Sequence, residues 1–434
     1  MQSSLICPVY VVAQCLLPRR SLGYRSFMAN NAANLRGYLL VTACYWAFTI
    51  SDGALRMLVL LHLHAEGQTA IALALLLVPY ELAGVVTNLL SGFLGARFGL
   101  KLPLVLGLAL QASACAMLAV EAAHLTMPYV MVTQVMSGVA KDLTKVSAKS
   151  YVRELAPDRS KTGLFRLVAW MTGSKNAMKG FGFFVGGALL GWCGFGSTNL
   201  GLAIGLGVVA VLSIAVLPRV AGRRAKSLRG LLQQSRMIVW LSTARAFLFG
   251  SRDAWFSVAL PLYLIAIGWS VLAVGAALSV WVIVYGFAQG LAPSITKRAN
   301  HQDGIRLVRN YTASLVVPVL TTAVLVACEV QPTTSILVGL CVYGVLFAIT
   351  SSLHSWLVVS LHDDDRTAER VGFYYAANAV GRLAGTLLSG FLYAASEDPA
   401  EGLVYCLYAS VIAVILATIG TRQLERAARL ISAS

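Results

Sequence analysis

Charged side chains are scarce in this sequence. Only 12% of its 434 residues are Asp, Glu, Lys or Arg, whereas 58% are hydrophobic. Charged residues make up about 25% of an average soluble domain. The composition therefore excludes an ordinary soluble globular protein and indicates an all-α membrane protein.

Acidic residues and cysteine motifs are also lacking. The chain has 34 Lys and Arg against 18 Asp and Glu, a net charge of +16. Most basic residues lie in short hydrophilic gaps between apolar segments, as is typical of membrane proteins, so we expect no nucleic-acid partner. The eight cysteines show no C-x-x-C or other ligand spacing. We therefore expect no metal and no other cofactor, and interpret most cysteines as small buried hydrophobes.

Twelve apolar segments follow Gly37, each long enough to cross a bilayer as a helix. Their approximate limits are 38–63, 68–96, 102–121, 126–147, 163–192, 197–217, 238–266, 271–293, 307–328, 333–360, 371–395 and 401–421. The longest basic gap, 218–237, follows the sixth segment. The sequence thus predicts two six-helix halves, 38–217 and 238–421, joined by a basic cytoplasmic linker.

The two ends of the chain lie outside these halves. Residues 1–37 form an N-terminal extension that we predict to be disordered, because Leu5 to Leu17 is too short to span and lacks the marks of a signal peptide. Met28 is an alternative start, so we expect function not to need residues 1–27. Residues 422–434 are expected to form a cytoplasmic tail.

The loops differ in charge on the two sides of the membrane. One set contains no Lys or Arg: 64–67, 121–124, 193–199, 267–270, 329–333 and 396–401. The opposite set contains most of the loop Lys and Arg, including Arg97, Lys101, Arg153, Arg219, Arg223, Lys297, Arg306 and Arg366. Because basic loops stay in the cytoplasm, both termini are predicted to be cytoplasmic.

The two halves show weak internal similarity. Asp52 in the first segment matches Asp253 in the seventh at an offset of 201 residues. In the fifth and eleventh segments, Lys179 matches Arg382 at an offset of 203, and two nearby glycines match as well. Parallel six-helix halves with a site between them resemble the major facilitator fold.

A loop motif strengthens this resemblance. The stretch from Gly92 to Lys101, Gly-Phe-Leu-Gly-Ala-Arg-Phe-Gly-Leu-Lys, is similar to the superfamily signature G-x-L-x-D-R-x-G-R-K. Gly95 replaces the usual Asp, which puts the charge lock of that loop in doubt. The resemblance implies a gating role for Gly92, Arg97, Gly99 and Lys101.

Charges inside the apolar segments predict a site. The basic ones are Arg56, Lys141, Lys145, Lys175, Lys179, Arg245, Arg252 and Arg382, and the acidic ones are Asp52, Glu81, Asp142 and Asp253. A buried charge is retained where it faces protein or a water-filled cavity, so the positive excess predicts a cavity for an anion with more than one charge. The substrate-binding candidates are Lys141, Lys145, Lys175, Lys179, Arg245, Arg252 and Arg382, with Tyr375 and Asn378 as neutral hydrogen-bonding groups.

Some of these cations have a simpler interpretation. Lys145 and Lys149 lie near a helix end, where lysines commonly reach the lipid headgroups, and this interpretation is favoured for both. Lys175, Arg252 and Arg382 have no acidic residue three or four positions away. A role in ligand binding is favoured for these three.

The carboxylates have two interpretations. Glu81 and Asp52 are candidates for proton coupling, because the protonation of a buried carboxylate responds to neighbouring charges. The alternative for Glu81 is a salt bridge between helices. Asp52 with Arg56, and Asp142 with Lys145, are alternatively pairs within one helix.

Two expectations concern single side chains near these groups. Arg252 and Asp253 are adjacent and diverge by about 100° on a helix, so each is expected to have a partner elsewhere. His354 is a lone histidine in the tenth segment, and a hydrogen-bonded structural role is favoured over a proton relay.

A more specific resemblance covers residues 36–420. It rests on six pieces in order: Tyr45–Met57, Tyr80–Leu89, Ser137–Leu143, Thr172–Ala177, Ser351–Ser355 and Gly372–Arg382. Together they resemble the ArsJ-type organoarsenical efflux transporters of the major facilitator superfamily.

The resemblance implies a transporter and not an enzyme, one that exports 1-arseno-3-phosphoglycerate across a bacterial inner membrane by alternating access. It also implies a functional partner, a glyceraldehyde-3-phosphate dehydrogenase that makes this compound from arsenate. Arsenic and the outward direction come from the resemblance and not from the charge pattern. Two alternatives remain: a transporter of an ordinary organophosphate anion, and an intramembrane enzyme acting on a phosphorylated substrate, for which no nucleophile–base constellation is visible.

Overall fold

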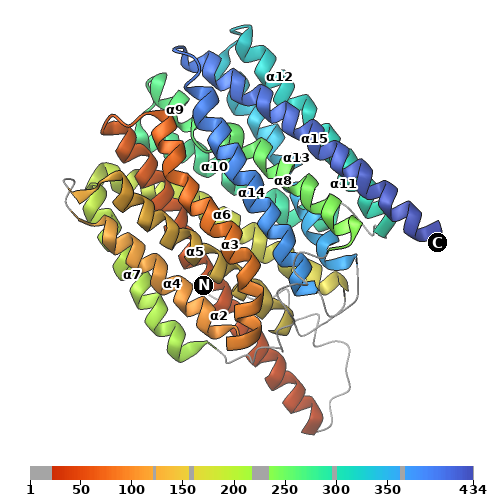
Figure 1. Ribbon diagram of the computed structural model, residues 1–434. Helices are drawn as coiled ribbons and strands as arrows, with labels where there is room; N and C mark the ends of the chain where they lie inside the picture. Colours follow the sequence, from red (N-terminus) through yellow and green to blue (C-terminus); the bar gives the residue numbers. More distant parts are fainter. Residues whose placement is uncertain are drawn as a thin grey trace, which may run out of the picture.

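The chain folds into a bundle of α-helices (Figure 1). A computed structural model describes residues 22–120, 124–155, 161–217, 234–295, 301–361 and 367–433. The helices are α2 (Leu22–Ala65), α3 (Ala70–Phe98), α4 (Lys101–Leu118), α5 (Met127–Leu155), α6 (Lys161–Cys193), α7 (Phe195–Val216), α8 (Arg236–Phe256), α9 (Ala259–Ala266), α10 (Val271–Ile295), α11 (His301–Ser314), α12 (Val316–Ala327), α13 (Pro332–Ser360), α14 (Thr367–Tyr393) and α15 (Pro399–Ala433). The predicted all-α class is confirmed.

Two six-helix halves lie side by side. In Figure 1 helices α2 to α7 occupy one side of the bundle and α8 to α15 the other. The pairs α8/α9 and α11/α12 are each one crossing interrupted by one or two residues, which gives the twelve predicted transmembrane crossings.

The break between α8 and α9 is stabilised from a neighbouring helix. A helix start leaves backbone N–H groups without acceptors, which is costly in a membrane. The hydroxyl of Ser389 on α14 accepts from the N–H of Val258 at 3.2 Å and of Ala259 at 3.0 Å. One side chain thus compensates for the interruption.

The halves touch where glycines allow their helices to approach. A Cβ at Gly173 of α6 would lie 2.6 Å from the carbonyl oxygen of Gly286 on α10. One at Gly180 would lie 2.7 Å from the carbonyl oxygen of Ser279. Small residues therefore set the distance between α6 and α10, as in other packed membrane helices.

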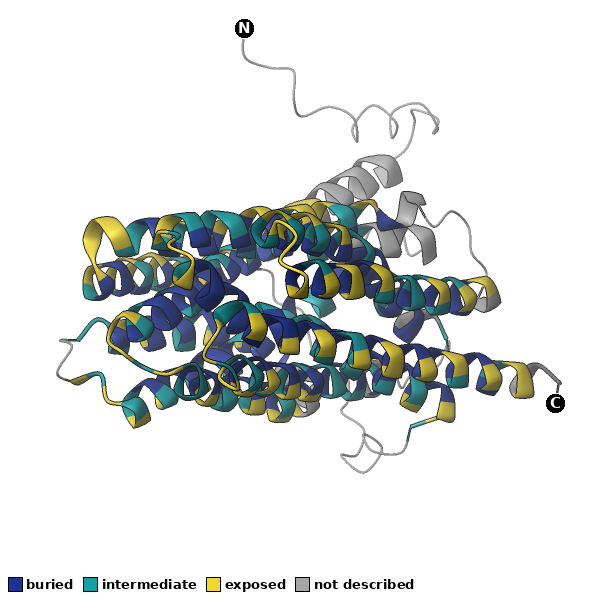
Figure 2. Cartoon of the chain, turned by 90° about the horizontal axis from the view of Figure 1, so that it is seen from above, coloured by how far each residue is buried: buried dark blue, intermediate teal, exposed yellow. Residues whose placement is uncertain are grey.

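Charge is concentrated on four of the long helices. Eight segments of the described chain are long and apolar enough to cross a membrane, and α5, α6, α8 and α14 are not among them. These four carry Lys141, Lys175, Arg252 and Arg382 respectively. The outer surface is apolar instead, with Val211 of α7 67% exposed. Figure 2 shows buried residues inside the bundle and exposed ones along its outer faces.

The N-terminal end of the described chain differs from expectation, and the C-terminal end is helical. Helix α2 begins at Leu22, so residues 22–37 are helical and not disordered, while residues 1–21 lie outside the described part. The predicted tail 422–434 continues α15 to Ala433. Hydropathy marks only the membrane-embedded part of a helix, whereas the backbone hydrogen bonds continue into polar sequence. Of the linker 218–237, residues 218–233 lie outside the described part.

Candidate functional site

A polar cavity lies between the two halves. Its volume is about 1170 Å³, open mouth included, and side chains of α2, α3, α5, α6, α8, α10, α13 and α14 line it. The structure brings together all nine substrate-binding candidates: Lys141, Lys145, Lys175, Lys179, Arg245, Arg252, Tyr375, Asn378 and Arg382. Asp52 and Glu81 line the same cavity.

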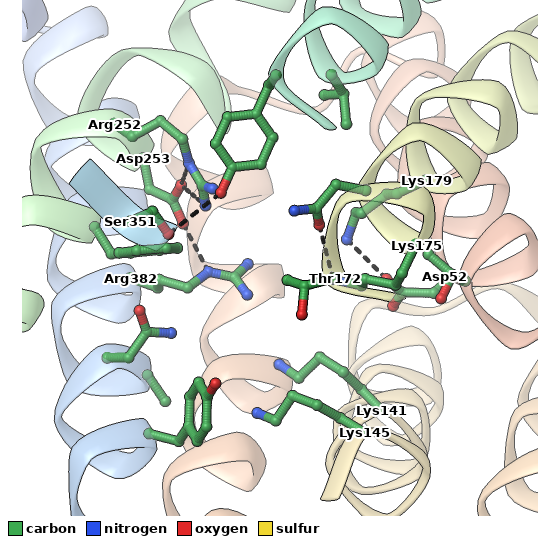
Figure 3. A pocket seen from close by; sticks show the side chains of 18 of the residues that line it. Asp52, Lys141, Lys145, Thr172, Lys175, Lys179, Arg252, Asp253, Ser351 and Arg382 are labelled. Carbon is green, nitrogen blue, oxygen red and sulfur yellow. Dashed lines mark hydrogen bonds and ion pairs between the residues drawn. The ribbon is translucent and has the colours of Figure 1, made fainter. Parts of the chain in front are cut away.

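Helical spacing places the lysines on one wall. Lys141 and Lys145 are one turn apart on α5, and Lys175 and Lys179 are one turn apart on α6. Figure 3 shows the two pairs on the side of the cavity opposite Arg252 and Arg382. Lys149, one turn further along α5, lines the cavity too. Lys145 and Lys149 thus face the cavity, and the headgroup interpretation was wrong.

The cavity has more cations than the protein neutralises. Nine lining side chains are basic: Arg56, Lys141, Lys145, Lys149, Lys175, Lys179, Arg245, Arg252 and Arg382. Four are carboxylates: Asp52, Glu81, Asp142 and Asp253. Five positive charges are therefore left over among the lining residues.

Asp52 pairs across helices and not within its own. Its carboxylate accepts from Lys179 of α6 at 2.7 Å and from the Tyr80 hydroxyl of α3 at 2.6 Å. Arg56 reaches Glu81 instead, at 2.9 Å. The suggested pair of Asp52 with Arg56 is replaced by these contacts, because both facing helices present partners. The suggested pair of Asp142 with Lys145 is confirmed.

Glu81 forms a salt bridge between helices, the alternative that its sequence position allowed. It accepts from Arg56 at 2.9 Å and from Arg382 at 2.6 Å, and its other oxygen lies 3.6 Å from Lys141 Nζ. Arg382 also donates to Asp253 at 2.9 Å. Arg382 therefore joins a carboxylate of each half.

The expectation that Arg252 and Asp253 each have a partner elsewhere is confirmed for Asp253, which accepts from Arg382 of α14 at 2.9 Å, and is wrong for Arg252. Arg252 pairs with its neighbour Asp253, with Nη2 to Oδ1 at 2.5 Å, because its long side chain folds back toward the next residue. Arg252 and Arg382 lack acidic neighbours at helical spacing, yet both contact Asp253, and Arg382 also contacts Glu81. Local spacing does not reveal partners on other helices.

Three of the cations that line the cavity lack a carboxylate within ion-pair distance in the described chain. Lys175 donates to the Asn176 side-chain oxygen at 3.1 Å, and Lys149 donates to the Tyr375 hydroxyl at 2.5 Å. Arg245 is only 4% exposed. It donates to the backbone and hydroxyl oxygens of Ser351 and to Asn378, and its guanidinium lies 3.9 Å from the Phe249 ring centroid. Neutral acceptors and an aromatic face hold these groups, so no carboxylate competes with a ligand for them.

Comparison with known proteins now decides the family. The family model described as Major Facilitator Superfamily matches residues 38–386. The chain belongs to this superfamily. No curated protein matches its sequence. As a member of the Major Facilitator Superfamily, it is a multi-pass membrane protein and a transporter rather than an enzyme.

Solved structures share the major facilitator fold. The human organic anion transporter MFSD10 (TETRAN) is similar with a TM-score of 0.67 and 14% identity, over 89% of this chain and 99% of that one. A bacterial homologue of the iron transporter ferroportin, in an outward-facing state with soaked iron, has a TM-score of 0.64 and 16% identity, over 89% and 98% of the two chains. At this identity the likeness concerns the fold.

Sequence reasoning missed part of the lining on α10. Trp281, Tyr285 and Gln289 all line the cavity. The rings of Trp281 and Tyr285 stack with centroids 5.8 Å apart, and Gln289 accepts from Asn176 of α6. The available signal was their spacing of four residues, which places them on one face of an otherwise apolar helix. This wall offers aromatic faces and neutral hydrogen bonds beside α6.

Of the predicted gating motif, the two residues that are described, Gly99 and Lys101, do not line the cavity. Gly99 ends α3 with φ 77°, which glycine adopts readily, and α4 starts two residues later. Lys101 donates to the carbonyl oxygens of Ile214 and Leu217 and so caps the end of α7. The side chains at Gly92 and Arg97 lie outside the described part. A gating role for these four residues stays a prediction.

His354 differs from its expected hydrogen-bonded role. It is fully buried on α13, and neither ring nitrogen has a partner among the described residues. It is also absent from the cavity lining. The structure therefore offers no role for it in the site.

Proposed function

We propose that this transporter exports an anionic organoarsenical, 1-arseno-3-phosphoglycerate, by alternating access and so confers arsenate resistance. One observation supports the anionic part: nine cations and four carboxylates line the same cavity. Uncompensated charge inside a membrane protein is costly and is retained for a function. A ligand with two or more negative charges would complete the balance.

Cations without carboxylates lie on both halves. Arg245 belongs to α8, whereas Lys149 and Lys175 belong to α5 and α6. A ligand held between them contacts both halves at once. This arrangement suits a carrier in which the two halves rock about a central site.

The charge of the cavity supports an anion more than a metal ion. One is named as an organic anion transporter and the other as a homologue of an iron transporter. A net positive cavity repels a metal cation. In the described residues, no group of three or more His, Cys, Asp or Glu side chains is placed to hold a metal ion. Anion transport is therefore the better supported choice.

The arsenical part rests on resemblance to the ArsJ-type transporters. The cavity is compatible with it, since phosphate and pentavalent arsenate groups are both oxyanions that Arg and Lys bind through their oxygens. Such groups need no soft thiolate ligands. Consistently, no described cysteine is among the lining residues.

An ordinary organophosphate is the second candidate substrate. The same surplus of cations favours it, because a phosphoglycerate also carries a phosphate and a carboxylate. Export of the arsenical would protect the cell from arsenate, whereas transport of an organophosphate would not. Arsenate resistance therefore distinguishes the two candidates.

Arsenate resistance of a sensitive bacterium tests the proposal. We expect resistance only when this protein and a glyceraldehyde-3-phosphate dehydrogenase that accepts arsenate are expressed together. If the protein is present in the membrane and gives no resistance either with or without the dehydrogenase, arsenical export is contradicted. Vesicles that move labelled 3-phosphoglycerate but not the arseno compound would establish the organophosphate instead.

A further inference from the structure

Lys175 differs from the other lysines of the cavity. Lys141 lies 3.6 Å from Glu81, Lys145 pairs with Asp142, and Lys179 lies 2.7 Å from Asp52. The fourth, Lys149, donates to the Tyr375 hydroxyl and lies over its ring. Among the described residues, Lys175 has a single hydrogen-bond partner, the side-chain oxygen of Asn176, its neighbour on α6. It therefore has the weakest compensation for a positive charge.

The helices packed against α6 do not supply that compensation. These helices are α10, α2, α7 and α5. Their charged or titratable lining groups are Tyr45, Asp52 and Arg56 on α2, Lys141, Asp142, Lys145 and Lys149 on α5, and Tyr285 on α10, while α7 has none in its sequence. Asp142 and Asp52 are the two carboxylates, and they already accept from Lys145 and from Lys179 and Tyr80 respectively. The surroundings of Lys175 are net positive.

We propose that Lys175 is the group that couples proton binding to substrate binding: its amine is neutral in the empty cavity and binds a proton when an anion arrives. This inference rests on the proposed anion site. Neighbouring cations repel a positive charge on an amine that has no carboxylate partner, so the neutral amine is favoured. A bound dianion attracts that positive charge and so favours the protonated amine. Arginines do not lose their protons, so the choice lies among the lysines.

The step involves one proton only. The lone pair of the Lys175 nitrogen takes a proton from a hydronium ion or a buffer acid, whose bond to that proton breaks to leave water or the buffer base, and the ammonium then faces the bound anion. No other bond changes. The anion is thereby bound together with one additional positive charge, which affects how membrane potential and pH gradient act on transport.

The carboxylates suit this role less well. Asp52 accepts from Lys179 and Tyr80, and Glu81 accepts from Arg56 and Arg382. Protonating either would leave a buried cation without its partner, which is costly. The structure therefore favours Lys175 over the two acidic candidates derived from the sequence.

Calorimetry in buffers of different ionisation enthalpy measures the protons exchanged on binding. The purified full-length protein is titrated with 3-phosphoglycerate and, separately, with sulfate. At about pH 8.5 both are fully ionised, since a phosphate monoester loses its second proton near pH 6. We expect uptake of up to about one proton per bound anion for the wild type. Binding without uptake overturns the inference but leaves the anion site intact.

Two matched variants test whether Lys175 is the residue that takes up the proton. Lys175→Arg keeps the positive charge permanently, so we expect it to bind anion with proton uptake near zero. Lys101→Arg is the control, because Lys101 caps α7 outside the cavity, and proton uptake should persist in it. Uptake that persists in Lys175→Arg, or disappears in Lys101→Arg, overturns the assignment. Absence of binding with both anions in the wild type overturns the proposed anion site as well.

Discussion

Arg382 Nη2 lies 2.6 Å from Glu81 Oε1, and this ion pair joins the two halves of the bundle. Glu81 belongs to α3 of the first half, and Arg382 to α14 of the second. The pair lines the cavity in which the surplus positive charge lies. We expect a bound anion to compete with Glu81 for Arg382, which would link occupancy of the cavity to the contact between the halves.

Removing the charge of Glu81 should make stability depend on anions. In Glu81→Gln, Arg56, Arg382 and Lys141 lose their shared carboxylate, and breaking a buried pair costs about 3–5 kcal/mol. We expect a lower melting temperature in detergent, partly restored by sulfate or 3-phosphoglycerate. The control is Glu401→Gln, at an exposed position near the start of α15. An equal response of both variants to anions would contradict the link.

Loss of a central cation should abolish resistance. We expect Lys175→Ala or Arg382→Ala to remove arsenate resistance at normal membrane levels, since a charge-assisted hydrogen bond contributes about 1.5–3 kcal/mol, or roughly ten- to a hundredfold in affinity. Arg429→Ala is the comparison, because that side chain is 67% exposed near the end of α15. Full arsenate resistance in both cavity variants would show that Lys175 and Arg382 are not needed for substrate binding.

A methyl group at the helix contact should separate the halves. In Gly286→Ala the new Cβ would lie 2.6 Å from both the Ala177 nitrogen and the Gly173 carbonyl oxygen. We expect a loss of about 1–3 kcal/mol in the free energy of unfolding and slower transport. Gly290, one turn away on α10, has no atom within 4 Å of such a Cβ, so Gly290→Ala should behave as wild type. The melting temperature and the rate of uptake into vesicles are measured for both variants and for the wild type.

The break in the seventh crossing should depend on one hydroxyl. Ser389→Ala leaves the N–H groups of Val258 and Ala259 without the oxygen that accepts from both. We expect a destabilisation of about 1–3 kcal/mol, the cost of buried donors without an acceptor. Ser335→Ala, at an exposed position, serves as the reference in thermal unfolding. Equal melting temperatures would show that another group replaces the Ser389 oxygen.

Much of the site could be predicted because helical spacing is local. Four residues make about one turn, so Lys141 and Lys145, like Lys175 and Lys179, had to share a face. Partners on other helices could not be predicted in this way. Lys179 and Asp52 are 127 residues apart, and Arg382 and Glu81 are 301 apart. The pairs formed depend on which helices pack together.

Hydropathy and loop charge by themselves determined that this chain crosses a membrane twelve times in two halves, because lipid requires long apolar helices. They also showed that cations outnumber carboxylates inside it. Only the tertiary structure decided that Arg252 and Arg382 have carboxylate partners while Lys175 has none. Charge pairing acts over a few ångströms in space, and the packing of the helices sets those distances.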